Sequence, residues 1–172
     1  MLFRSDAEGH GVPWDEYGRC KSQYHNAYVI LGLAAAAVAN RPNAHELLHT
    51  MLHDQERHWL EGNGLVRDQY SEDFSDVLPV RTIGTLLHTA EAYLAAAEAT
   101  TDPVWLERAE VMAEFAHQSA SEHEWRLPEY YDNSWKPLIG EPEGMCDRRR
   151  IYHGYVTGHV IEIGRASCRE RV

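Results

Sequence analysis

Two alanine-rich segments constrain the possible folds of this chain more than any other feature. The first is KSQYHNAYVILGLAAAAVAN at residues 21–40, and the second, at residues 83–99, contains the run AEAYLAAAEA. Alanine is the strongest helix former, and long apolar segments with this composition are typical of helices that pack closely against one another. Both segments are therefore predicted to be α-helices.

Each alanine-rich helix is followed by a break and then by a second segment with helical periodicity. RPN ends the first helix, and Asn43 is predicted to cap a second helix that runs to about Trp59. TTDP ends the next alanine-rich helix, where Thr101 or Asp102 is the predicted cap of a fourth helix and Pro103 lies in its first turn. The sequence therefore predicts two helical hairpins.

The two hairpins resemble one another. Ala27–Tyr28 opens the apolar part of the first hairpin as Ala92–Tyr93 opens that of the second, at an offset of 65 residues, and Trp59 and Trp125 close the two hairpins. A repeat of this length is typical of stacked helix pairs, because no single pair can bury its apolar face alone. We therefore predict an all-α protein in the form of a helical toroid or solenoid.

Long loops separate the predicted hairpins. Residues 61–79 and 124–157 contain glycine, proline and charged residues without sustained periodicity, and a fifth helix is predicted to begin at Gly158. The final segment, IGRASCRERV at residues 163–172, has no periodicity and resembles the translation of a sequencing adapter. We therefore expect residues 1–162 to be a fragment of one catalytic domain and residues 163–172 to be a non-native tail.

Charge and composition restrict the possible partners. The formal net charge is −11, whereas a nucleic acid or an anionic membrane surface must be met by clustered lysine and arginine. The chain has no run of eighteen apolar residues, and acidic residues interrupt its N-terminal segment. Its three cysteines are far apart and form no disulfide framework or paired metal motif. We expect a cytoplasmic protein that binds neither nucleic acid nor membranes.

The motif HELLH at residues 45–49 has the spacing of a helical zinc site, and a zinc-dependent hydrolase is the alternative function that it suggests. The apolar stripe of the same helix consists of Ala44, Leu47, Leu48, Met51 and Leu52. At about 100° per residue, His45, His49 and His53 lie roughly 90°, 130° and 170° from the centre of this stripe. The histidines are therefore predicted to lie on a solvated face, and no metal ligand is assigned.

Two H-x-x-E pairs lie at the beginnings of helices that follow long loops. His88 and Glu91 lie in the opening turns of the helix at residues 83–99, and His159 and Glu162 lie at the beginning of the predicted fifth helix. One such pair is usually a contact on a helix surface. Because helix N-termini meet at one end of a toroid, two pairs there can converge on a common site.

Four blocks in order carry a resemblance to a known family. KSQYHNAYVILGLAAAA, LLHTAEAYLAAAEATTDPVWLERA, WRLPEYYDNSWKP and GHVIE resemble the N-acylglucosamine 2-epimerase family, particularly its mannose isomerase and sulfoquinovose isomerase branch. The resemblance implies an (α/α)6 barrel that isomerises or epimerises a monosaccharide, with no metal or other cofactor. The chemistry is proton transfer next to a carbonyl, for which histidine titrates in the right range.

The resemblance also implies roles for individual residues. His159 corresponds to a catalytic histidine that moves a proton between C1 and C2 through an enediol, and Glu162 would hold the substrate or orient that imidazole. His88 corresponds to a catalytic-site histidine that contacts the sugar and assists ring opening. Tyr24 corresponds to an aromatic substrate contact, although a tyrosine at helical spacing is also consistent with ordinary core packing.

Arg149 or Arg150 corresponds to a sugar-binding arginine, with a solvated loop as the alternative interpretation of the arginine run. The chain departs from the family pattern before His88, where Gly84 and Leu86 replace asparagines. This departure leaves open which sugar is bound, because amide groups discriminate between sugar hydroxyls. A non-catalytic helical-repeat protein that binds a partner or a glycan is the remaining alternative.

The resemblance implies that the chain is truncated. The second catalytic histidine of the family lies in the C-terminal half, and about five helices cannot close a barrel of twelve. We expect the 172-residue polypeptide alone to be inactive and prone to aggregate, because apolar helix faces would be exposed. The sequence leaves open whether the product is a ketose or an epimer and whether the full-length protein forms a homo-oligomer.

Overall fold

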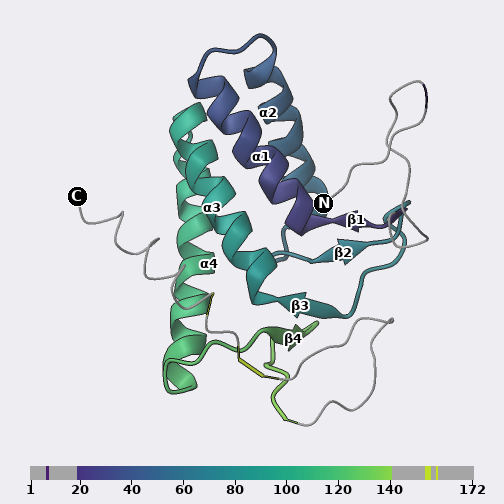
Figure 1. Cartoon of the computed structure of the whole chain (residues 1–172), viewed down its shortest axis with the longest axis vertical. Coiled ribbons are helices and arrows are strands. Elements are labelled where there is room, and N and C mark those ends of the chain that lie inside the picture. Colours follow the sequence, from purple (N-terminus) through teal and green to yellow (C-terminus); the bar gives the residue numbers. More distant parts are fainter. Residues whose placement is uncertain (1–6, 8–18, 141–153, 156–157, 159–172) are drawn as a thin grey trace.

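The computed structural model describes residues 7, 19–140, 154–155 and 158, and helices dominate this part of the chain (Figure 1). The described helices are α1 (Gln23–Val38), α2 (Ala44–Asp54), α3 (Ile83–Thr100) and α4 (Pro103–Glu122), and a π-helical turn, η2 (Gln55–Trp59), continues α2. Helix α3 packs against both α1 and α4, and α1 packs against α2. The two predicted hairpins are therefore confirmed.

Helices α1 and α3 begin at the same end of the molecule, beside a group of short strands (Figure 1). The described strands are β1 (Lys21–Ser22), β2 (Gln69–Tyr70), β3 (Val80–Thr82) and β4 (Tyr130–Asp132). Strand β1 pairs antiparallel with β2, and β3 pairs antiparallel with β4. The prediction that residues 61–79 and 124–157 contain only loop is therefore wrong at β2 and β4. These strands are shorter than the four residues at which alternation becomes visible in a sequence.

One of the two predicted helix N-caps is confirmed. Asp102 caps α4, with its carboxylate accepting from the backbone N–H of Val104 at 3.1 Å, and Pro103 occupies the first helical position, as predicted. Asn43 makes no side-chain cap bond and has a left-handed backbone with φ of 62°. An N-cap needs an extended backbone to aim its side chain at the first turn, so the prediction for Asn43 is wrong.

The register of the helical repeat also differs from the prediction. Ser22 and Thr82, which precede α1 and α3, are 60 residues apart, and Asn43 and Asp102, which precede α2 and α4, are 59 apart. The predicted offset of 65 residues is therefore wrong by about five. Alanine occurs throughout both helices, so matching their alanine runs does not fix the alignment.

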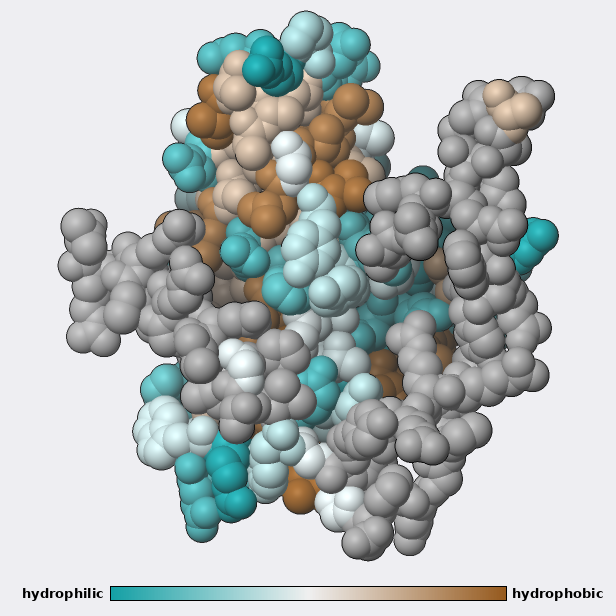
Figure 2. Space-filling model, in the orientation of Figure 1, coloured by the Kyte–Doolittle hydropathy of each residue, from teal (hydrophilic) through white to brown (hydrophobic). Residues whose placement is uncertain are grey.

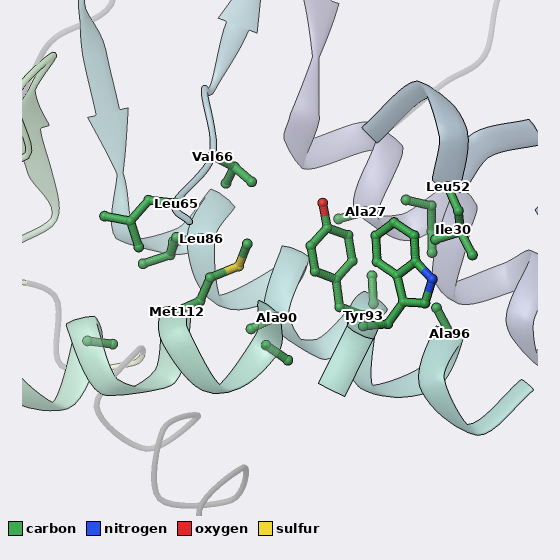
Figure 3. Close-up of a cluster of buried hydrophobic side chains, with 14 of the residues drawn as sticks. Ala27, Ile30, Leu52, Leu65, Val66, Leu86, Ala90, Tyr93, Ala96 and Met112 are labelled. Carbon is green, nitrogen blue, oxygen red and sulfur yellow. The ribbon is translucent and has the colours of Figure 1, made fainter. Parts of the chain in front are cut away.

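The core lies between the helices (Figure 3). Its described members include Ile30 of α1, Leu48 and Leu52 of α2, Leu86 and Tyr93 of α3, and Met112 of α4. Leu47 was predicted to belong to the buried stripe of α2, but it is 51% exposed. Helix α2 packs mainly against α1, so only a narrow stripe of it is covered.

Buried polar side chains join α1, η2 and α3. The side-chain amide of Gln23 donates to Oε1 of Gln55 at 2.5 Å and to the hydroxyl of Thr89 at 3.2 Å. The hydroxyl of Tyr93 donates to the same Gln55 oxygen at 3.0 Å. Buried polar groups that are hydrogen-bonded fix the relative position of the segments that carry them. This network holds the beginning of α1 against α3.

Candidate active site

Three ring side chains converge near the beginnings of α1 and α3. Tyr24 and Tyr28 lie one turn apart on α1, and His88 lies in the second turn of α3. The ring centroids are 5.3 Å apart for Tyr24 and His88, 5.1 Å for Tyr28 and His88, and 5.2 Å for the two tyrosines. We call Tyr24, Tyr28, His88 and Glu91 the ring cluster.

The polar atoms of the ring cluster lie within hydrogen-bonding distance of one another. The hydroxyl of Tyr28 lies 3.2 Å from Nε2 and 3.5 Å from Nδ1 of His88, and it lies 3.4 Å from the hydroxyl of Tyr24. Nδ1 of His88 also lies 3.5 Å from a carboxylate oxygen of Glu91. An imidazole beside a carboxylate and a hydroxyl is an arrangement suited to acid–base catalysis.

The ring cluster is accessible to a ligand. Tyr24 is 38% exposed and Tyr28 is 44% exposed, whereas the side chain of His88 is 18% exposed. Tyr24 is therefore not an ordinary core residue. Figure 2 shows one face of the molecule, on which apolar residues gather over the half of the helices away from the strands, while polar residues lie at the far tip and closer to the strands. The exposed, polar character of the ring cluster suits a ligand rich in hydroxyl groups.

Of the predicted site residues, the structure brings Tyr24 and His88 together. His159, Glu162, Arg149 and Arg150 lie outside the described residues. Their roles, and the meeting of His159 with His88, stay predictions.

Tyr28 was missed by the sequence reasoning. It follows Tyr24 by four residues, which places both side chains on one face of a helix. This spacing could have identified Tyr28 as a second aromatic contact of the site.

The two positions that depart from the family pattern do not face the ring cluster as polar groups. Leu86 is fully buried and belongs to the core, and Gly84 is buried at the beginning of α3. The polar neighbours of His88 therefore come from α1 and from Glu91 one turn later.

The histidines of HELLH lie on the outer face of α2. His45, His49 and His53 are all exposed, as the helical angles predicted, and Glu46 beside them is also exposed. Among the residues that the structure describes, no group of three histidine, cysteine, aspartate or glutamate side chains is placed to hold a metal ion. The geometry gives the zinc hydrolase alternative no support.

A cavity of about 100 Å³ lies beside the C-terminal part of α4. It is lined by Phe115, Gln118, Ser119, Glu122, His123, Tyr131, Trp135 and Pro137. None of these lining residues belongs to the ring cluster. The candidate active site is therefore an open face at the ends of α1 and α3 and is separate from this cavity.

Asp68 joins the beginnings of the two helices that carry the ring cluster. Its carboxylate accepts from the backbone N–H of Thr82 at 2.9 Å and from the hydroxyls of Thr82 and Thr85 at 2.7 and 2.9 Å. Its backbone carbonyl accepts from the N–H of Gln23 at 2.9 Å. Because Thr82 caps α3 and Gln23 begins α1, this one residue helps to set the relative position of the two helices.

Burial raises the pKa of Asp68 from 3.8 to about 6, against the opposing effects of its hydrogen bonds and of Arg81. A carboxyl whose pKa is higher in the folded state than in the unfolded state stabilises the fold when it is protonated. The contribution of Asp68 to the free energy of unfolding is therefore complete below about pH 4 and is lost as the pH rises to about 6. We expect urea unfolding to show that the free energy of unfolding of the wild type falls by about 3 kcal/mol relative to Asp68→Asn across this range.

The amide of Asp68→Asn does not ionise, and its shape matches the protonated carboxyl. Asp76→Asn, which alters an exposed carboxyl, serves as the control and should follow the wild-type curve. Parallel pH profiles for the wild type and Asp68→Asn would show that Asp68 does not titrate with a raised pKa.

A model of the family described as N-acylglucosamine 2-epimerase (GlcNAc 2-epimerase) matches residues 9–166, which is most of the chain. The chain belongs to the N-acylglucosamine 2-epimerase family. The resemblance seen in the four sequence blocks is thereby confirmed.

Curated relatives of this N-acylglucosamine 2-epimerase family chain include two bacterial D-mannose isomerases. The protein from Thermobifida fusca is 36% identical over 149 residues, an alignment that covers 84% of this chain and 36% of the relative. The protein from Pseudomonas cannabina pv. alisalensis is 34% identical over 167 residues, covering 93% of this chain and 40% of the relative. The chain thus spans well under half the length of these curated relatives.

Solved structures of epimerases and isomerases share the fold. A crystal structure of D-mannose isomerase superposes with a TM-score of 0.67 at 27% identity and covers 79% of this chain and 35% of that one. Cellobiose 2-epimerase from Spirochaeta thermophila DSM 6192 gives a TM-score of 0.63 at 25% identity and covers 71% of this chain and 33% of that one. The helical hairpins of this N-acylglucosamine 2-epimerase family member therefore form part of an (α/α)6 barrel, as predicted.

In the described residues of this family member, no helix combines the length and the apolar character that crossing a membrane requires.

Proposed function

We propose that this chain is part of a sugar isomerase or 2-epimerase that acts on a monosaccharide. The reaction is either aldose–ketose isomerisation, such as mannose to fructose, or inversion at C2. Membership of the N-acylglucosamine 2-epimerase family and the likeness to D-mannose isomerases support this proposal. The observation that carries it is the ring cluster, which presents an imidazole and two phenol hydroxyls at the open ends of α1 and α3.

The proposed chemistry is proton transfer next to a carbonyl group. A base removes the proton from C2 of the open-chain aldose, which gives an enediolate, the anion of the enediol, with its negative charge on O1. Return of a proton to C1, with transfer of the O2 proton to O1, gives the ketose, whereas return to the opposite face of C2 gives the epimer. Histidine suits both steps because it accepts and donates protons near neutral pH.

The individual residues have distinct proposed roles. His159 moves the proton between C2 and C1, and Glu162 orients its imidazole or holds the sugar. His88 contacts the sugar and assists ring opening, with Tyr24 packed against the sugar beside it. Arg149 or Arg150 binds a sugar oxygen.

The complete proposed site requires more helices than this chain supplies. The chain spans 36–40% of the curated relatives that it matches. We therefore propose that turnover belongs to the full-length protein, meaning a polypeptide that extends this chain to the length of those relatives. The 172-residue chain alone is expected to be inactive.

Isotope exchange tests the proposed function directly. The full-length protein is incubated in D₂O with mannose, glucose or N-acetylmannosamine, and NMR follows the loss of the C2 proton signal. We expect deuterium to enter C2 of at least one of these sugars, because the protonated base exchanges the abstracted proton with solvent before a hydrogen returns to carbon.

His159→Ala is the active-site control, and it should abolish the exchange. The outer-face variant His45→Ala should leave exchange unchanged, because His45 is exposed on α2. Sugar binding without exchange in the wild type would instead favour a non-catalytic binding protein.

A further inference from the structure

One buried hydrogen bond joins the sequence neighbours of Tyr24 and His88. Gln23 immediately precedes Tyr24 on α1, and Thr89 immediately follows His88 on α3. The side-chain amide of Gln23 donates to the hydroxyl of Thr89 at 3.2 Å, and both side chains are fully buried. Successive residues of a helix point about 100° apart, so the buried pair and the exposed ring cluster occupy the same turns of α1 and α3.

The surroundings of this bond use both N–H groups of the Gln23 amide. The hydroxyl of Thr89 donates to the backbone carbonyl of Thr85 at 2.7 Å, so it offers a lone pair to Gln23. The other N–H of the amide donates to Oε1 of Gln55 at 2.5 Å. Removal of the Thr89 hydroxyl would therefore leave one buried N–H without a partner, which is costly.

Apolar packing alone fixes the separation of α1 and α3 poorly. Helix α1 has five buried residues, and three of them are the alanines Ala27, Ala34 and Ala37. Short side chains let two helices approach closely but interlock little, whereas a buried hydrogen bond requires a defined length and direction. Asp68 holds the first residues of the two helices, and the bond between Gln23 and Thr89 lies beside the ring cluster itself.

We propose that Gln23 and Thr89 are positioning residues of the candidate active site, and that the hydrogen bond between them holds Tyr24 and His88 at the separation that a sugar requires. Neither residue touches the ligand, because both side chains are fully buried. This inference rests on the proposed function for the identity of the ligand. The separation of the two rings, 5.3 Å between their centroids, is a property of the protein alone.

The contact between the two rings is measured by NMR of the full-length protein, with His88→Gln and Tyr24→Phe assigning the signals. We expect a nuclear Overhauser effect between ring protons of Tyr24 and His88 in the wild type, because the rings meet edge to face. In Thr89→Val, which keeps the shape of the side chain but loses the hydroxyl, this effect should weaken. Gln23→Met removes the donor in place of the acceptor and should weaken it in the same way.

Two control variants isolate the hydrogen bond. Thr89→Ser keeps the hydroxyl and should keep the contact between the rings. Thr100→Val is the matched control, because the hydroxyl of Thr100 also donates to a carbonyl one turn earlier, that of Ala96 at 2.7 Å, and its other bond is to the backbone of Asp102, which lies outside α1. An unchanged ring contact in Thr89→Val and Gln23→Met, or an equal loss in Thr89→Ser, would overturn the proposal.

A kinetic measurement connects the ring separation to the sugar. With a sugar that the full-length protein turns over, Thr89→Val should lower kcat by about tenfold, the size expected for one hydrogen bond, and change KM by less than about twofold. Thr89→Ser should restore kcat, and a loss that serine does not restore would contradict the positioning role. If the ring contact responds as expected but the wild type turns over no sugar, the proposed function is refuted and the control of the ring separation by Gln23 and Thr89 stands.

Discussion

Replacement of His88 by asparagine in the full-length protein is expected to lower kcat/KM for its sugar by a factor of about 10²–10⁴. His88 provides the only imidazole of the ring cluster as the structure describes it, and its nitrogens contact Tyr28 and Glu91. Asparagine keeps a polar side chain of smaller size but does not exchange a proton near neutral pH. Initial-rate kinetics with the sugar identified by isotope exchange would measure the loss.

The control for this experiment is a histidine of similar sequence context on another face. His49→Asn alters an exposed residue on the outer face of α2 and should retain wild-type kinetics. Circular dichroism should be unchanged in both variants, because neither removes a fully buried side chain. Wild-type kcat/KM in His88→Asn would show that the ring cluster does not take part in turnover.

The second large effect concerns stability. Tyr93→Ala is expected to lower the free energy of unfolding by about 3–5 kcal/mol, the range for removal of a large aromatic side chain from a core. Tyr93 is fully buried, its ring packs edge-on to Trp105 at a centroid distance of 4.9 Å, and its hydroxyl donates to Gln55. Figure 3 shows it beside Ala27 of α1. Urea unfolding of the full-length protein measures the change.

Two variants separate the causes of that loss. Tyr93→Phe removes only the hydroxyl and should cost about 1 kcal/mol, because Gln55 keeps its bond from Gln23. Val38→Ala, at an exposed position of α1, should change the free energy by less than about 0.5 kcal/mol. A loss of less than about 1 kcal/mol in Tyr93→Ala would show that α1 and α3 do not pack around this side chain as described.

The helices were predictable because their signals are local. Alanine content fixed the existence of α1 and α3, and Asp102 followed by Pro103 marked the beginning of α4 within one residue. The strands were not predictable, because β2 and β4 have two and three residues and form only where a partner strand is present. Leu47 shows the same limit, since its exposure depends on which helices lie beside α2.

The candidate active site was predictable only in part for a related reason. His88 and Tyr24 were identified from their sequence blocks, and the structure places their rings 5.3 Å apart. The predicted meeting of His88 with His159 lies outside the described residues. The contact between Tyr28 and His88 depends on how α1 and α3 are aligned, and the alanine runs gave that alignment incorrectly. A repeat of 60 residues places these two side chains at equivalent positions, whereas the predicted repeat of 65 does not.

The most direct test of a sugar site at the beginnings of α1 and α3 is a crystal structure of the full-length protein soaked with mannitol, an open-chain analogue of mannose, which is one of the proposed substrates. We expect a mannitol oxygen within about 2.6–3.2 Å of a ring nitrogen of His88, with Tyr24 packed against the ligand. Mannitol bound elsewhere in the barrel, with His88 in contact only with protein groups, would contradict the proposed location of the active site.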